Sequence, residues 1–203
     1  MKKTKKRYFL LFLALIMSFS CLHVSAASGS FKSDVQKSVN GFFAAAKKYN
    51  MKKMSKYFEK PEEILSDTKG NEALKSVEKL FKRTNKKLSY KISNIKVKGK
   101  NATVKVKCKY QDLSDVYKKT YVKLALYIAA NPDATLEDAL IYEFKTLPKV
   151  YKTELKKDKI RYTTKNITLK LRKSNNTWKM KKCTDSVTDM LHGNILKTNK
   201  DLF

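Results

Sequence analysis

Glycine, proline and histidine are scarce in this 203-residue sequence, which has five glycines, three prolines and two histidines. Loops that cradle phosphate groups need closely spaced glycines, and no glycine-rich phosphate-binding motif occurs. Neither the GxSxG turn of serine hydrolases nor the HExxH helix of zinc proteases is present. Enzyme signatures are therefore mostly absent, and we expect neither a cofactor nor a metal.

Acidic residues are also few, because 18 Asp and Glu stand against 46 Lys and Arg, for a formal net charge of +28. Such an excess favours contact with polyanions, although a biased genome composition would also enrich lysine. Arginine is nearly missing, and its planar fork is what reads phosphates and guanine edges. We therefore expect diffuse attraction to a polyanionic wall polymer or an anionic membrane surface, and no sequence-specific recognition of nucleic acid.

The first 26 residues have the order basic, apolar and small that is typical of a secretory signal peptide. The apolar run from Phe9 to Leu22 is short for a membrane span of about 20 residues. Small residues at Val24-Ser25-Ala26 predict cleavage after Ala26 and a secreted, extracytoplasmic protein. Alternatively, Cys21 is the lipid-bearing cysteine of an anchored lipoprotein, although Phe19 fits that motif poorly.

After the signal peptide, the hydrophobic periodicity predicts that the first elements of the chain are helices. We expect residues 27–32 to form a tether, followed by helices over residues 33–49, 51–58 and 71–84. Pro61 ends the second of these helices.

From residue 88 the hydrophobic period changes to two, which predicts a hairpin of strands 88–97 and 102–110. The phase slips at Ser93-Asn94, as a β-bulge would make it do. Strands over residues 166–172 and 177–182 form a second predicted hairpin.

The region between the hairpins, residues 112–157, is predicted to be helical. Its first helix, which ends before Asn131-Pro132-Asp133, has little polar face. The second opens with a capping box at Thr135 and Asp138 and kinks or ends at Pro148. A last helix over residues 185–198 closes a single domain (residues 33–199), and residues 200–203 form a tail.

This order of elements resembles the nuclear-transport-factor-two-like (cystatin-like) superfamily, and in particular its small exported bacterial families, which are mostly of unknown function. The resemblance is carried by Phe42–Asn50 leading into Met54–Phe58, by Gly99–Val106, by Ile167–Leu171 and by Trp178–Met180. It implies an α+β cone in which helices pack on a curved four-stranded antiparallel sheet, with the helical region as an insert longer than the family leads us to expect. Members use the cone for catalysis, ligand binding or dimerisation, so the fold alone says little about function.

Basic side chains occupy the polar positions of the predicted strands, and like charges directly opposite each other destabilise a sheet. One interpretation is a solvated face that protects the sheet edges. The other is an electrostatic platform that holds a non-enzymatic accessory module on polyanions of the cell surface. The platform residues are Lys96, Lys98, Lys105, Lys107, Lys109, Lys170, Arg172, Lys179 and Lys181.

A small-ligand-binding protein is the alternative function, because several aromatic residues with polar tips could line a pocket in the cone or could simply form its core. These residues are Tyr90, Tyr110, Tyr117, Tyr121, Tyr127 and Trp178. A homodimer is also compatible with the superfamily.

Two weaker patterns remain. Asp185, Asp189 and His192 share a face of the last helix, so that an Asp–His pair could serve as acid and base in a hydrolase or isomerase, although a surface helix end is the simpler interpretation. Cys108 and Cys183 could form a disulfide in an exported protein, but they lie at different strand parities and would need a bulge or a strand end to meet.

Overall fold

A computed structural model of the chain describes residues 31–63 and 72–202. The expected signal peptide, the cleavage site after Ala26, Cys21 and residues 27–30 of the tether lie outside the described residues. The elements are an N-terminal helix (residues 31–47), α2 (Met51–Ser55), the 3-10 turn η1 (Pro61–Glu63), α3 (Glu72–Asn85), β1 (Ser89–Lys98), β2 (Asn101–Asp112), α4 (Ser114–Ala130), α5 (Leu136–Lys156), β3 (Arg161–Ser174), β4 (Thr177–Met180), α6 (Asp185–His192) and α7 (Ile195–Leu202).

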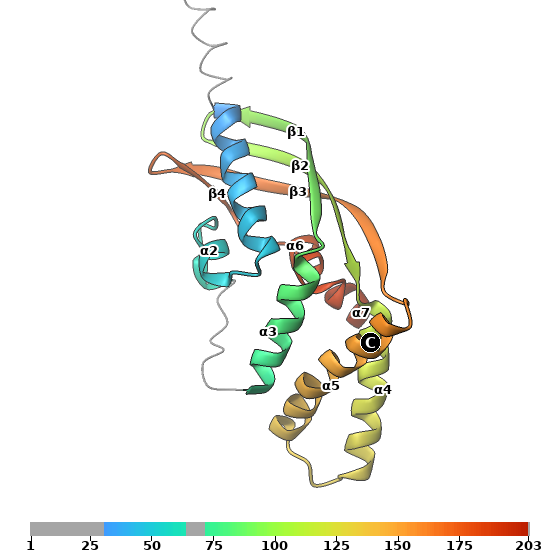
Figure 1. Cartoon of the computed structure of the whole chain (residues 1–203). Helices are drawn as coiled ribbons and strands as arrows, with labels where there is room; N and C mark the ends of the chain where they lie inside the picture. Colours follow the sequence, from blue (N-terminus) through green and yellow to red (C-terminus); the bar gives the residue numbers. More distant parts are fainter. Residues whose placement is uncertain (1–30, 64–71, 203) are drawn as a thin grey trace, which may run out of the picture.

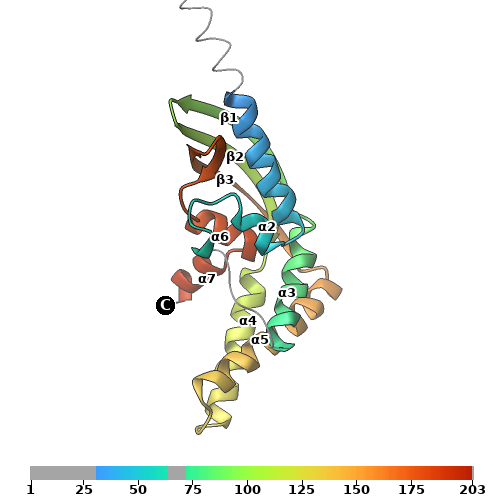
Figure 2. The same ribbon diagram turned by 90° about the vertical axis from the view of Figure 1, so that its left-hand side faces the viewer.

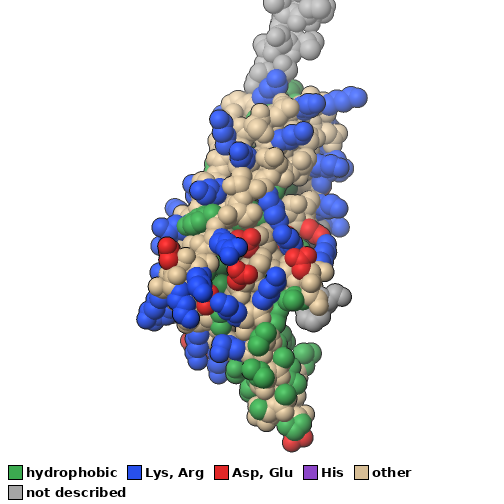
Figure 3. All heavy atoms as spheres, turned by 90° about the vertical axis from the view of Figure 1, so that its right-hand side faces the viewer, with side chains coloured by type: hydrophobic (Ala, Val, Ile, Leu, Met, Phe, Trp, Pro, Cys, Tyr) green, Lys and Arg blue, Asp and Glu red, His purple; other side chains and the backbone are tan. Residues whose placement is uncertain are grey.

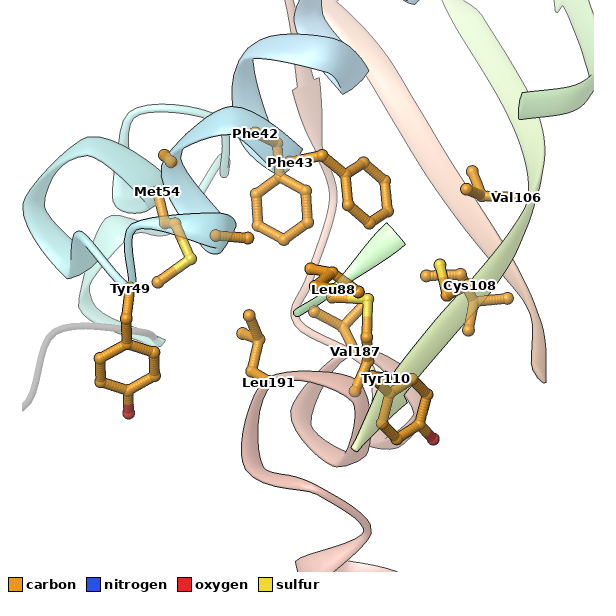
Figure 4. Packing of buried hydrophobic residues seen from close by; sticks show 14 of the residues in the cluster. Phe42, Phe43, Tyr49, Met54, Leu88, Val106, Cys108, Tyr110, Val187 and Leu191 are labelled. Atoms are coloured by element: carbon orange, nitrogen blue, oxygen red, sulfur yellow. The ribbon is translucent and has the colours of Figure 1, made fainter. Parts of the chain in front are cut away.

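The four strands form one antiparallel sheet in the order β1-β2-β3-β4, and the N-terminal helix runs along its inner face (Figures 1 and 2). The expected α+β class, with two hairpins and a helical insert between them, is therefore confirmed. Phe42 and Phe43 of the helix are fully buried, as are Val104 and Val106 on β2 (Figure 4 shows part of this core). Burial of such side chains contributes about 1.5–3 kcal/mol each, which makes this layer the main stabilising contact of the fold.

The slip predicted at Ser93-Asn94 is a true bulge. Ile92 pairs with Val106 and Asn94 with Lys105, so Ser93 is left without a partner position in the ladder. Its hydroxyl donates to the Lys105 carbonyl over 3.1 Å. The extra residue restores Ile95 and Val97 to the side of the sheet that packs against the core.

Strand β3 begins at Arg161, five positions before the predicted start, and pairs with β2 from Asp112 back to Asn101. The prediction was too short because Thr163 and Lys165 occupy the inner positions of this early part, where no apolar alternation can show. Lys165 reaches inward and donates to the Asn194 side chain over 2.8 Å.

Helices α4 and α5 form a helical hairpin (residues 114–156) that projects from one end of the sheet (Figure 1). Pro148 was expected to kink or end the second helix. It does not end it, because α5 continues to Lys156. Leu147, Val150 and Tyr151 are buried around the proline. Their burial outweighs the one backbone hydrogen bond that a proline removes.

The C-terminal helix is broken into α6 and α7. Gly193 follows α6 in the left-handed conformation, with φ +66°, and Asn194 has φ +71°. Helix α7 then runs to Leu202 and takes in residues that were expected to be a tail. At the other end, the N-terminal helix already includes Phe31 and Lys32 of the expected tether, and Phe31 packs against the core.

Candidate functional site

The aromatic residues expected to line a pocket do not surround one space. Tyr110, Tyr117 and Trp178 are core residues with at most 3 % of their surface exposed. The Tyr110 hydroxyl donates to the Asn194 side chain over 2.8 Å, and the Tyr117 hydroxyl donates to the His192 carbonyl over 2.6 Å. These three rings therefore fill the cone, and the two tyrosine hydroxyls hold its C-terminal segment in place.

The other three aromatic residues lie apart from each other. Tyr90 stacks on Phe43 with ring centroids 4.1 Å apart, at the N-terminal helix. Tyr121 donates to Asn199 of α7 over 2.8 Å. Tyr127 stacks on Tyr142 at 4.1 Å, between α4 and α5. Sequence periodicity marks all six rings as inward-facing, and it does not distinguish a filled core from a pocket wall.

The residues of the predicted basic platform occupy outward positions of the sheet, apart from Lys181. Seven of its side chains are exposed. They alternate with buried residues along β2 and in the later part of β3 and with half-buried residues along β1, while Lys179 on β4 is half-buried. Lys181 follows the end of β4 and is half-buried, with its backbone N–H on the Lys170 carbonyl. Lys91 of β1 occupies an outward position as well, and sequence reasoning missed it because the bulge lies between it and Lys96.

The strand register keeps most of these ammonium groups apart. Lys105 lies between Asn94 and Thr168, and Lys109 lies between Ser89 and Thr164. Like charges are direct neighbours at Lys91 and Lys107, and at Arg172 and Lys179. Small polar partners thus reduce the repulsion that opposed lysines would cause.

The Asp–His pair is not formed. Asp189 is buried, and its carboxylate accepts the backbone N–H groups of Leu196 and Lys197 in the first turn of α7. His192 contacts the Thr188 carbonyl through Nδ1 over 3.0 Å and the Tyr49 hydroxyl through Nε2 over 2.8 Å. Burial lowers the pKa of His192, so the neutral ring links α6 to the end of the N-terminal helix.

The remaining acidic residue of that group, Asp185, is exposed and forms an ion pair with Lys200. Cys108 and Cys183 are not bonded to each other. Cys108 is fully buried on β2, and burial raises the pKa of its thiol to about 12. Within residues 31–63 and 72–202, no three His, Cys, Asp or Glu side chains are grouped as metal ligands.

The helical hairpin presents hydrophobic side chains to solvent. None of the residues 121–145 is buried, although most of α4 beyond Tyr121 is apolar. Leu126 is 66 % exposed and Leu136 is 78 % exposed. Figure 3 shows hydrophobic side chains gathered on the projecting hairpin, while Lys and Arg side chains are scattered over the rest of that face. A helix with little polar face is normally buried, and nothing in the part of the chain that the structure describes covers this one.

A groove of about 790 Å³ runs between α4 and α5 on this hairpin. Val122, Leu126, Tyr142 and Val150 supply its apolar wall. Five lysines line it together with Thr146, Thr153 and Glu154, namely Lys118, Lys119, Lys123, Lys149 and Lys157. We call this space the hairpin groove.

One ion pair lies in the lining of the hairpin groove. The Lys119 ammonium lies 2.6 Å from the Glu154 carboxylate, whose residue is only 4 % exposed, and the pKa of Glu154 is lowered by this contact. Among the described residues, no ion pair involves the other four groove lysines. The groove therefore combines an apolar wall with cations that have no carboxylate partner there.

Comparison with known proteins gives partial likenesses. A family model described as "Putative lumazine-binding" matches residues 30–117. A solved structure titled as a putative lipoprotein (ycdA) from Bacillus subtilis subsp. subtilis str. 168 is 16 % identical, with a TM-score of 0.40 over 78 % of this chain. The match spans 46 % of that solved chain, which is less than half its length. No curated protein matches the sequence.

The family match supports the superfamily resemblance over the first helices and the first hairpin. It ends at Tyr117, so the hairpin groove lies beyond it. A smaller cavity of about 410 Å³ lies inside the matched part, where Tyr49, Val77 and Phe81 are among its lining residues. In the described part of the chain, no helix is both apolar enough and long enough to span a bilayer.

Proposed function

We propose that this protein is an extracytoplasmic, non-catalytic binding module, and that its ligand is a small molecule with an apolar body and an acidic group. The ligand lies in the hairpin groove. The observation that carries this proposal is the groove itself, an exposed apolar surface beside lysines on an insert that the sheet does not need.

The size and the apolar wall of the groove support a small ligand. Ligand sites in proteins usually enclose about 300–1,000 Å³ and are lined mainly by hydrophobic and aromatic side chains. The groove measures about 790 Å³, and Val122 and Leu126 on its wall are 61 % and 66 % exposed. Covering such side chains contributes about 25 cal/mol per Å² of apolar surface removed from water.

The lysines of the groove select the polar end of the ligand. Lys118, Lys123 and Lys149 line the space and are exposed. At about 4 Å, an ion pair near a protein surface is attracted by a Coulomb energy of roughly 4 kcal/mol, most of which is offset by lost hydration. A carboxylate, sulfonate or phosphate on the ligand therefore adds orientation and modest affinity.

The family description agrees with small-molecule binding in general, and the signal-like N-terminal segment agrees with an extracytoplasmic location. The matched segment does not include the groove, so the description gives no ligand for it. The smaller cavity beside Tyr49 and Phe81 is the natural comparison site.

The test uses the fluorescent probe 1-anilinonaphthalene-8-sulfonate, which combines an apolar ring system with one acidic group. We expect saturable binding to the folded protein. Leu126→Asp and Lys149→Glu should each weaken binding about tenfold or more, because about 1.4 kcal/mol corresponds to a factor of ten. Val77→Asp, at the smaller cavity, and Lys170→Glu, on the outer sheet face, are matched controls that should bind as the parent does.

Two results contradict the proposal. Binding that Leu126→Asp leaves unchanged would remove the groove as the site. Loss of binding in Val77→Asp alone would move the site to the smaller cavity. Circular dichroism of each variant establishes that it is folded before its binding is compared.

A second function is favoured by the register of the sheet. We propose that its outer lysines also hold the protein on a polyanionic surface, because Asn, Ser and Thr partners leave Lys105 and Lys109 exposed and out of contact with carboxylates. Retention on anionic liposomes or wall teichoic acid should fall steeply with salt, since bound lysines displace counterions. A triple Lys105→Gln, Lys107→Gln, Lys109→Gln variant should lose most of the retention, and salt-independent retention would contradict the idea.

A further inference from the structure

Charge is unevenly distributed along the helical hairpin. Residues 124–144, around its tip, contain Asp133, Glu137, Asp138 and Glu143 and no Lys or Arg. The parts nearer the sheet carry lysines on both helices, including Lys118, Lys119 and Lys123 on α4 and Lys145, Lys149 and Lys152 on α5. The protein as a whole is strongly positive, whereas the tip of the hairpin is locally acidic and apolar.

The tip also exposes several large apolar side chains. Leu136 is 78 % exposed, Ile128 47 % and Leu140 41 %. Leu136 and Leu140 are one helical turn apart, so they share a stripe of α5. Nothing in the described chain covers this stripe. An exposed apolar patch that is bordered by charged or polar side chains is typical of a protein interface.

We infer that the occupant of this surface is a second copy of the same chain, whose helical hairpin packs antiparallel against the first. Helices α4 and α5 have 17 and 21 residues, so they are about 25 and 32 Å long at 1.5 Å per residue. A two-fold axis across the middle of the hairpins brings each acidic tip to the lysines near the other copy's sheet. The contact is self-complementary, so it is complete in a dimer and does not extend to further copies.

Charge favours a second copy over an anionic membrane as the occupant. The cytoplasmic and outer surfaces that carry anionic lipid attract lysine and repel carboxylates. Asp133 and Glu137 are exposed at the very end that would enter the bilayer surface. The same carboxylates are attracted by Lys123 and Lys149, which no carboxylate of the described chain neutralises.

The pairing bears on the proposed ligand site, and in this respect it rests on the proposed function. The hairpin groove is open along the side that contains Val122 and Leu126. In the antiparallel pair, the tip of the other copy lies over that side, with its Leu136 as the nearest apolar cover. The complete ligand site then has walls from both copies.

The test exploits the symmetry of the pair and uses two double variants of the full chain. The tip variant carries Asp133→Lys and Glu137→Lys, and the base variant carries Lys123→Glu and Lys149→Glu. Each variant alone places like charges at both contacts of its pair. A mixture of the two restores opposite charges at both contacts, because each variant supplies what the other lacks.

Sedimentation velocity without any probe measures the pairing separately from ligand binding. We expect the parent protein to dimerise at tens of micromolar, each double variant to dimerise at least about tenfold more weakly, and the equimolar mixture to recover a heterodimer. Leu136→Ser with Leu140→Ser, which leaves all charges in place, should also weaken the parent dimer.

Three results overturn the inference: a parent protein that stays monomeric, double variants that dimerise as the parent does, or a mixture that fails to pair. Co-sedimentation with anionic vesicles that depends on Leu136 and Leu140, without self-association, would assign the surface to a membrane instead. Probe binding to the monomer would still support the groove as a site if the pairing failed, so the two proposals fail separately.

Discussion

The junction between the helical hairpin and the rest of the protein depends on Gly193. This residue has φ +66°, and a Cβ placed on it would lie 2.5 Å from Cγ of Leu113 and 2.9 Å from Cβ of Leu113. Leu113 is fully buried, precedes α4 and donates its backbone N–H to the Gly193 carbonyl over 3.0 Å. A side chain at Gly193 therefore pushes directly on the entry to α4.

We predict that Gly193→Ala destabilises the protein through two additive causes. The left-handed conformation costs an alanine about 1–2 kcal/mol. Forcing a methyl group against buried Leu113 costs about 1–3 kcal/mol more, because the core has to shift. Together they lower the free energy of unfolding by about 2–5 kcal/mol, which corresponds to a fall in Tm of roughly 5–15 °C for a chain of this size.

The matched control is Gly99→Ala in the turn between β1 and β2. Gly99 has φ +55°, so it shares the conformational cost, and nothing lies within 4 Å of a Cβ there. The difference between the two variants isolates the steric cost, which we expect to be about 1–3 kcal/mol. Urea unfolding followed by the fluorescence of Trp178, which is 3 % exposed in the fold, measures both variants. Equal destabilisation by the two substitutions would refute the assignment of Leu113 as the obstacle.

Three further predictions concern buried polar groups. Burial lowers the pKa of His192 below 6.5, so the unfolded chain takes up a proton before the folded protein does, and the free energy of unfolding should fall as the pH drops below about 6.5. Urea titrations at pH 7.5 and 5.5 should show a smaller fall in this free energy for His192→Gln than for the parent. Asp189→Ala removes the acceptor of two N–H groups of α7 and should cost about 1–2 kcal/mol in urea unfolding, whereas exposed Asp185→Ala should cost under about 0.5 kcal/mol. Cys108 should resist thiol reagents at pH 8 in the native protein and react once urea unfolds it, and rapid native labelling at this residue would contradict its burial.

The sheet was the most predictable part of the fold, because a period of two has one physical meaning when one face is buried. The bulge at Ser93 was found from a single break in that rhythm, and the structure confirms it. The early half of β3 gave no such rhythm, since Thr163 and Lys165 fill its inner positions. Backbone pairing with β2 holds that half in the sheet, and pairing between distant strands leaves no mark on the local sequence.

The candidate site was less predictable. Hydrophobic residues predict burial, so the apolar α4 was recognised as a helix with little polar face while Leu126 was not expected to be exposed. The aromatic residues were expected to face inward, but the sequence could not show whether they line a pocket. Tyr117, for example, would have the same sequence spacing in a pocket wall as in a packed core. The one local signal for the site was the stretch from residue 124 to 144, where lysine is missing from a lysine-rich chain.

The ladder between β2 and β3 has a consequence for how this protein can change. Asp112 and Arg161 are cross-strand partners, although the whole helical hairpin separates them in sequence. Whole turns can therefore be gained or lost beyond Tyr121 and before Thr146 without altering any strand pairing or any buried side chain. Related chains are free to lengthen, shorten or replace this projection, and so to acquire different specificities on one unchanged scaffold.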